Sequence, residues 1–198
     1  MTVFALMPTL PGREEMRQKA IDSIHRQSYP NSWDVVLLMD ADPDLTLGAK
    51  LNKMLDSISN LPADHIILVD DDDLHHPTRV ARQIQPLIDN PNLLMTGTSQ
   101  IVFRDTRNNE VWRYTGTSDM WIGGLAFTAG AWKAHRFEDL GAGCDTRWQK
   151  QFSAQARLDL QDDSLMLCAI HANNTSKKYT VGQQWQRLPA VPESLMGL

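Results

Sequence analysis

The sequence predicts an α/β fold: a three-layer sandwich in which helices cover both faces of a mostly parallel central sheet. In the first half, short apolar runs of the kind that form buried strands alternate with stretches of helical periodicity. Units of strand, helix and strand join parallel strands through right-handed crossovers. In the second half, shorter strand-like segments separated by turn residues predict a smaller antiparallel portion.

The first half contains three strand–helix units. Apolar runs predict its three strands, at 3–7, 35–39 and 65–69. An apolar residue at every third or fourth position predicts its three helices, at 14–27, 48–59 and about 80–88. Glu14 and Glu15 in the first helical turn suit the helix dipole, and Pro86 is expected to distort the end of the third helix.

The second half has shorter elements. Strands are expected at 93–97, 99–104, 111–115, 122–128 and 165–171. Short helices are expected at 131–135 and 145–156. The tail after Thr180 has two prolines and no periodicity, which predicts either coil or an arm packed on the sheet edge. We expect one domain, 1–198, made of two halves, 1–97 and 98–180, and a tail, 181–198.

The composition is that of an ordinary globular protein. The 198 residues are 42% hydrophobic and 22% charged, and no apolar stretch approaches the roughly 20 residues of a membrane helix. The first residues lack the basic leader and cleavage site of a signal peptide. Cys144 and Cys168 form no close-spaced metal motif and are expected to be reduced thiols in a cytoplasmic protein. The net charge of −5 gives no overall basic footprint for nucleic acid.

Four consecutive aspartates, Asp70 to Asp73, follow the third predicted strand. Like charges this close are unfavourable unless a cation neutralises them. Carboxylate oxygens suit Mg²⁺ or Mn²⁺, which usually complete their shell with water and substrate phosphates. An isolated acidic run more often forms a solvated loop, but open α/β sheets bind ligands at the carboxyl ends of their strands, so we predict a divalent-metal site. His75 and His76, which follow, are expected to be exposed loop residues.

Polar residues also follow the neighbouring strands. Thr9 and Arg13 follow the first predicted strand, Asp40 the second, and His171 the last. If these strands are parallel, their carboxyl ends meet at one edge of the sheet. Several such side chains at one edge predict a single site together with the aspartates.

In this order and spacing, the motifs resemble those of family 2 glycosyltransferases with the GT-A fold. The stretch 23–30 resembles the family element Ser, three residues, Gln, one residue, Tyr-Pro, which precedes a strand ending in Asp, here Asp40. Other matches are Gly48-x-Lys50-x-Asn52, an Asp-x-Asp motif within 70–73, Gly123-Gly124 with Phe127 and Phe137, and the closing His and Asn-Thr element at 170–175. At 143–146 the family usually has Glu-Asp, and here Cys144 precedes Asp145. The resemblance extends from the first strand to about Ser176.

The resemblance implies a role for each matching residue. The nucleotide would be bound by Pro8, Thr9, Arg13, Asp40, Lys50, Asn52, Asp70 and Asp71. Mn²⁺ or Mg²⁺ would be bound by Asp70, Asp72 and His171, and the run of four leaves Asp71 and Asp73 as alternatives in the register. The acceptor would contact Trp121, Gly123 and Gly124. Asp145 would be the catalytic base, with Asp162 and Asp163 as alternatives.

The implied reaction is the transfer of one sugar from a nucleotide-sugar, by default a UDP-sugar, to an acceptor hydroxyl. The half 1–97 would bind the donor and the half 98–180 the acceptor. A single displacement with Asp145 as base inverts the anomeric centre. Gln184 to Arg187 do not match the Gln-x-x-Arg-Trp signature of processive synthases, which favours a soluble acceptor such as a glycan, a lipid-linked sugar, a protein, a small molecule or a modified nucleic-acid base.

Two other classes of function stay open. A nucleotidyltransferase also uses aspartate-bound Mg²⁺ on a similar sheet, but it should have a basic, glycine-rich loop after the first strand. The stretch 8–13 has one glycine, which disfavours that class. The second alternative is a non-catalytic module that binds a divalent metal or a nucleotide-sugar, in which Asp145 does no chemistry.

Overall fold

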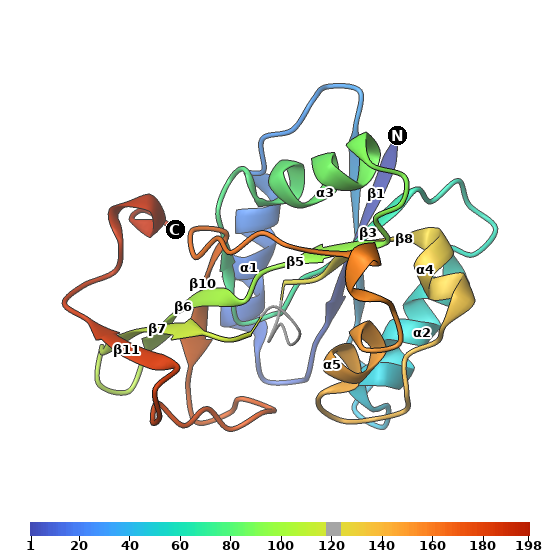
Figure 1. Cartoon of the computed structure of the whole chain (residues 1–198). Helices are drawn as coiled ribbons and strands as arrows, with labels where there is room; N and C mark the ends of the chain where they lie inside the picture. The colour runs from blue at the N-terminus through green and yellow to red at the C-terminus, as the bar shows by residue number, and fades with distance from the viewer. Residues whose placement is uncertain (118–123) are drawn as a thin grey trace.

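The computed structural model describes residues 1–117 and 124–198 and confirms the α/β architecture (Figure 1). Within the described residues, six strands form the main sheet in the order β2-β1-β3-β8-β5-β9. These strands are β1 (Thr2–Pro8), β2 (Asp34–Asp40), β3 (His65–Leu68), β5 (Met95–Gly97), β8 (Ala126–Thr128) and β9 (Arg157–Asp159). β1 pairs in parallel with both β2 and β3, β5 pairs in parallel with β9, and only β8 runs antiparallel to its described neighbours. The sheet is therefore mostly parallel.

Helices cover both faces of this sheet, as the alternation of side chains along β1 requires. Val3, Ala5 and Met7 point to one face and pack against α1 (Glu14–His25) and α3 (Arg79–Asp89). Phe4 and Leu6 point to the other face. There they pack into a core shared by α2 (Leu47–Ser57), α4 (Ala129–Ala134) and α5 (Cys144–Gln149).

A second, smaller sheet lies beside the first and has the order β11-β7-β6-β10-β4. Its strands are β4 (Leu74–His75), β6 (Gln100–Asp105), β7 (Val111–Thr115), β10 (Met166–Ile170) and β11 (Trp185–Leu188). β6 and β10 are parallel, and the other described pairings are antiparallel. Because β3 belongs to the main sheet and β4 to the second, the aspartates at 70–73 lie where the chain crosses from one sheet to the other.

Two predicted elements differ from the structure, and β9 was not predicted. The helix expected at 145–156 ends at Gln149, and the chain continues through a 3₁₀ turn (Ala154–Ala156) into β9. The periodicity missed β9, whose three residues pair with the edge of β5 and are too few to form a pattern. Of the strand expected at 122–128, 126–128 form β8, whereas 122 and 123 lie outside the described residues.

The tail is an arm packed on the sheet edge, the second of the two alternatives that its sequence allowed. β11 pairs antiparallel with β7 over four residues, and a 3₁₀ turn follows at Glu193–Leu195. Leu195 is 1% exposed and packs with Val102, Val111 and Leu167. Among residues 1–117 and 124–198, no helix is long and apolar enough to cross a membrane.

Replacement of Leu195 by alanine tests the docking of this arm. We expect Leu195→Ala to lower the free energy of unfolding by about 2–5 kcal/mol, because it leaves a cavity in a filled core. Met196→Ala is the matched control, since Met196 is 63% exposed and its truncation should change stability by no more than about 0.5 kcal/mol. Urea unfolding of both variants measures the difference, and equal stabilities would show that the arm is not docked.

Candidate functional site

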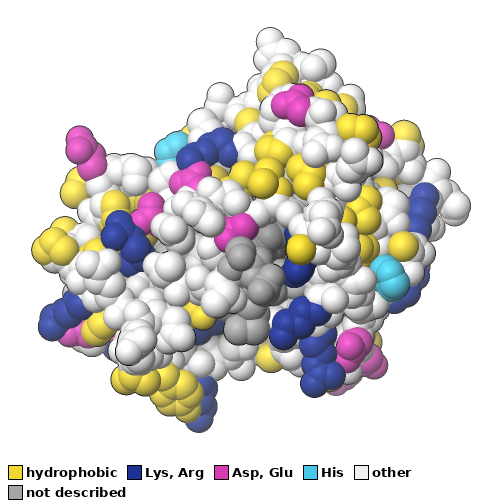
Figure 2. Space-filling view, viewed as in Figure 1, with side chains coloured by type: hydrophobic (Ala, Val, Ile, Leu, Met, Phe, Trp, Pro, Cys, Tyr) yellow, Lys and Arg dark blue, Asp and Glu magenta, His cyan; other side chains and the backbone are white. Residues whose placement is uncertain are grey.

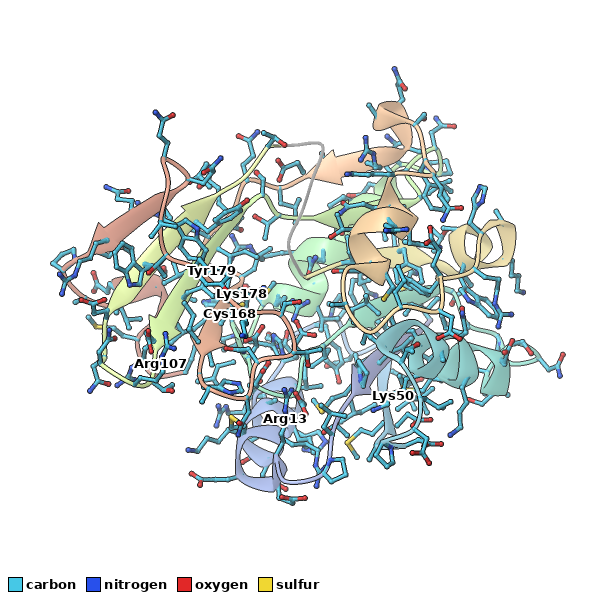
Figure 3. All side chains as sticks on the ribbon, turned by 90° about the horizontal axis from the view of Figure 1, so that it is seen from below. Arg13, Lys50, Arg107, Cys168, Lys178 and Tyr179 are labelled. Atoms are coloured by element: carbon cyan, nitrogen blue, oxygen red, sulfur yellow. The ribbon has the colours of Figure 1, made fainter. Side chains whose placement is uncertain are left out.

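A pocket of about 320 Å³ opens where the two sheets meet. Its walls come from the end of β1 and the loop after it, the start of α2, the aspartate run, the loop that leads into α5, and the segment that follows β10. Figure 3 views this region, with Arg13, Lys50, Cys168 and Lys178 labelled around it. Residues that are far apart in the sequence therefore share one concave site, as the carboxyl ends of parallel strands predict.

Asp71 is the aspartate most fully engaged with the protein. Its carboxylate accepts hydrogen bonds from the Thr9 hydroxyl at 2.5 Å and from Nη1 of Arg13 at 2.7 Å. The other terminal nitrogen of Arg13 donates to the carbonyl of Asn173 and, at 3.4 Å, to the hydroxyl of Thr175. Arg13 thus ties the start of α1 to the aspartate run and to the segment after β10, and Asp71 is neutralised by this ion pair.

Asp72 faces the segment after β10. Its Oδ2 lies 2.9 Å from Nε2 of His171 and 3.3 Å from the side-chain nitrogen of Asn174. The sequence separates Asp72 from His171 by 99 positions, and the structure makes them a contacting pair. A carboxylate and an imidazole that meet in this way are suitable ligands for a divalent cation.

Asp70 and Asp73 have no cationic hydrogen-bond partner among the described residues. Asp70 is open to the pocket but is surrounded by protein on its other sides, and this burial, with the charges of Asp72 and Asp145, raises its pKa to about 7. Asp73 is buried and accepts a hydrogen bond from the backbone nitrogen of Ala169 at 3.0 Å. Burial and the neighbouring charges of Asp72 and Asp70 raise its pKa well above the usual range.

A buried arginine lies beneath the aspartates, and sequence reasoning missed it. Arg79 is 0% exposed and donates to the carbonyl of Leu68 at 2.7 Å and to Oε1 of Gln83 at 2.8 Å. It also contacts Nδ1 of His75, which is 1% exposed, so the expectation of an exposed loop histidine was wrong. Burial and the charge of Arg79 hold the pKa of His75 well below its usual value. The spacing of four residues between Arg79 and Gln83 was the available signal, since it places both on one face of α3.

Asp145 lies in the first turn of α5 and lines the pocket. Among the described residues, no cationic side chain forms an ion pair with it. Gly143 precedes the helix with φ of 73°, a left-handed conformation that suits glycine. Burial raises the pKa of Asp145, and hydrogen bonds from the helix backbone oppose that effect. The neighbouring Cys144 is fully buried in the core, where burial raises its pKa to about 12, so its thiol has no role in the pocket.

The residues of the Gly48-x-Lys50-x-Asn52 motif have two different surroundings. Lys50 is buried, lines the pocket, and donates from Nζ to the carbonyl of Thr9 at 2.6 Å. Asn52 instead points away from the pocket lining. Its side chain donates to the carbonyl of Phe137 at 2.9 Å and accepts from the Phe137 backbone nitrogen at 3.2 Å. Gly48 donates from its backbone to the Leu140 carbonyl at 3.1 Å, so α2 holds the chain that leads to Asp145.

The other predicted site residues lie at the rim or elsewhere. Pro8 lines the pocket, whereas the carboxylate of Asp40 lies outside its lining and pairs with Lys53 at 2.8 Å. Gly124 adopts φ of 66° and lies outside the lining, where a side chain would meet Met166. Trp121 and Gly123 lie outside the described residues.

The donor atoms fit a hard divalent cation that is completed by a substrate. Among the described residues, no three His, Cys, Asp or Glu side chains already converge as a full set of ligands. Asp72 and His171 form a pair, and Asp70 presents a further carboxylate to the same pocket. One or two carboxylates with substrate phosphates are the usual arrangement for Mg²⁺.

Comparison with solved structures defines the fold class as the GT-A glycosyltransferase fold. TarS residues 1–349 of S. aureus in complex with UDP-GlcNAc matches 90% of this chain with a TM-score of 0.66 and 14% identity, over 62% of its own length. The mannosyltransferase PcManGT of Pyrobaculum calidifontis in complex with GDP-Man and Mn²⁺ matches 85% of this chain with a TM-score of 0.60 and 12% identity, over 56% of its length. No protein-family model matches the sequence, and no curated protein is similar to it in sequence. The chain thus spans less than two thirds of each structure, and the shared property is the fold.

Gly48 provides a test of the contact between α2 and the loop before Asp145. A Cβ at this position would overlap the carbonyl oxygen of Glu138, so we expect Gly48→Ala to destabilise the protein by about 1–3 kcal/mol. Gly130 is also the second residue of its helix, and a Cβ there meets only Thr128 Oγ1 at 3.8 Å. Gly130→Ala should therefore be neutral or stabilising. Thermal unfolding distinguishes the two, and equal effects would contradict the close approach.

The pKa of Asp70 predicts how pH affects the metal-free protein. Its folded pKa of about 7 exceeds the ordinary aspartate pKa of 3.8, so the folded chain binds more protons than the unfolded chain between those values. The contribution of Asp70 is therefore least unfavourable at low pH and destabilises the fold increasingly as pH rises toward 7. We expect Asp70→Asn to gain stability over wild type at pH 8 but not at pH 4.5, measured by urea unfolding in EDTA. An equal difference at both pH values would contradict the shift.

Proposed function

We propose that this chain is a metal-dependent, inverting glycosyltransferase that moves one sugar from a nucleotide-sugar to a hydroxyl of a soluble acceptor. The proposal rests on one observation. A single pocket contains Asp72, which pairs with His171 just outside the pocket lining, together with a separate, half-buried carboxylate at Asp145. Sugar transfer needs both a cation site for the diphosphate and a distinct base for the acceptor.

The donor would lie along the first half of the chain, 1–97. Pro8, Thr9 and Lys50 line the end of the pocket formed by β1 and α2, where a nucleoside would bind. Arg13 would act through Asp71 and the segment at 173–175 that it holds. A UDP-sugar is the proposed donor, since TarS binds UDP-GlcNAc, and a GDP-sugar, as bound by PcManGT, is the alternative that the nucleotide screen below distinguishes.

The reaction would be one displacement. The acceptor oxygen attacks the anomeric carbon, the bond from that carbon to the diphosphate oxygen breaks with its electron pair, and Asp145 takes the acceptor proton. A divalent cation held by Asp72, His171 and Asp70 supplies positive charge to the leaving diphosphate when it is bound. Because attack and departure occur on opposite faces of the sugar, the anomeric centre is inverted.

The second half, 98–180, would bind the acceptor, with Trp121, Gly123 and Gly124 on its path and 181–198 as the supporting tail. On the face shown in Figure 2, acidic and basic side chains are interspersed and no broad basic surface appears. This mixture favours a small molecule or a glycan over an extended nucleic acid on that face. If the acceptor is a nucleic acid, the group that enters the pocket would be a single modified base.

A thermal-shift screen tests the donor site. UDP-, GDP-, CMP- and dTDP-sugars are added with and without Mn²⁺ to wild type and to Asp72→Ala. At about 100 times the dissociation constant, binding stabilises a protein by about 2.7 kcal/mol, or roughly 5–10 °C at this size. We expect such a shift for one nucleotide class, only with metal, and its loss in Asp72→Ala. No metal-dependent shift with any nucleotide would refute the proposal.

Asp145→Asn separates a catalyst from a binding module. The variant should keep the metal-dependent shift, because the carboxamide has almost the same shape. We expect turnover to fall about 10²- to 10⁴-fold, the usual contribution of a general base. Metal-dependent hydrolysis of the donor measures this activity without a known acceptor. The released nucleoside diphosphate is the product that is detected. Undiminished hydrolysis would exclude Asp145 as the base.

A further inference from the structure

One lysine lies in the pocket on a segment that no motif singled out. The chain leaves β10 at Ile170 and returns to the sheet as β11 at Trp185 (Figure 1). Between these strands, 174–176 line the pocket. Its first part is fixed by the hydrogen bonds of Arg13 to Asn173 and of Asn174 to Asp72 and to the Ala169 carbonyl. Lys178 follows on the same segment and lines the pocket.

We propose that the Lys178 ammonium binds the diphosphate of the donor and stabilises it as it leaves. This inference rests on the proposed function and adds a residue to it. Figure 3 shows Lys178 beside Cys168, on the side of the pocket formed by the second sheet. In the structure its Nζ lies 5.9 Å from the centre of the Phe103 ring, a loose cation–π contact that a phosphate oxygen can replace.

The other positively charged side chains that line the pocket already form hydrogen bonds within the protein. Arg13 is bonded to Asp71 and Asn173, and Lys50 is bonded to the carbonyl of Thr9. Arg79 is 0% exposed and lies outside the pocket lining. Among the described residues, no carboxylate forms an ion pair with Lys178 in the structure, so its charge is available to a ligand.

Lys178 lies in the same pocket as a proposed metal ligand, Asp70, and the proposed base, Asp145. Burial raises the pKa of Asp145, and the positive charge of Lys178 opposes that effect, so the ammonium lies near the proposed base. The carboxylates that line the pocket repel a diphosphate, and an ammonium in the same pocket offsets part of that repulsion.

Lys178 would keep its proton throughout the reaction. As the bond between the anomeric carbon and oxygen breaks, the electron pair remains on the diphosphate oxygen, and the ammonium donates a hydrogen bond to that growing charge. The acceptor proton goes to Asp145, whose ionised form the same ammonium favours. Loss of the ammonium should therefore weaken diphosphate binding and also slow turnover.

Lys178→Met tests this role, with Lys177→Met as the matched control. Lys177 is the adjacent residue, is exposed, and lies outside the pocket lining. Titration calorimetry with Mn²⁺ uses two probes, the nucleoside diphosphate of the donor found in the screen and the same nucleoside without phosphate. We expect Lys178→Met to weaken diphosphate binding about 10- to 100-fold and to leave nucleoside binding unchanged. Lys177→Met should bind both as wild type does, and Lys178→Arg should recover most of the affinity.

The outcomes separate this inference from the proposed function. If wild type binds the diphosphate with Mn²⁺ and Lys178→Met binds it equally well, the role of Lys178 is wrong and the donor site stands. If both lysine variants weaken binding equally, the effect is one of general charge, and the inference also fails. If wild type binds no nucleoside diphosphate, the donor site and the inference fail together.

Discussion

The repulsion between four adjacent carboxylates is the constraint on which the site depends. The aspartates lie where the chain crosses from β3 to β4, and each meets a different neighbour there. Asp71 is paired with Arg13, Asp72 contacts His171, and Asp73 is buried against the backbone of Ala169. Asp70 is the one exposed aspartate of the four, and its pKa is raised to about 7. Separating the charges in this way leaves one ion pair, one carboxylate–imidazole contact, one carboxylate buried against the backbone and one carboxylate without a cationic hydrogen-bond partner among the described residues.

Most of the surrounding structure supports this arrangement from outside the motif. Arg79 places a buried positive charge beneath the run and bonds the end of β3 through the Leu68 carbonyl. The segment after β10 supplies His171 and Asn174 from one side, and it is fixed at its far end by the pairing of β11 with β7. The pocket is thus held by both sheets, and the C-terminal arm is part of its support.

The sequence predicted the strands that position the site better than the contacts between its side chains. The three parallel strands and the residues at their ends were predictable, because buried strands form continuous apolar runs and the chain direction fixes which ends meet. The contacts of Arg13 with 173–175 depend on a fold-back over some 160 positions, which no local pattern contains. Asn52 was predicted at the nucleotide, but its amide bonds Phe137. Arg79 was missed because a charged residue on a helix is ordinarily solvated, and only its neighbours show that it is buried.

The contact between α2 and 137–140 makes two walls of the pocket one mechanical unit. Lys50 lies on one wall, and Asp145 follows the other. Gly48 joins the two walls through its backbone N–H, and Asn52 joins them through its side-chain amide. A redesign of the proposed nucleotide site that exchanges the start of α2 alone would break these contacts and displace Asp145. Such an exchange has to transfer 45–52 and 137–145 as a matched pair. Under the proposed function, selectivity for the donor and the placement of the base would therefore be inherited together.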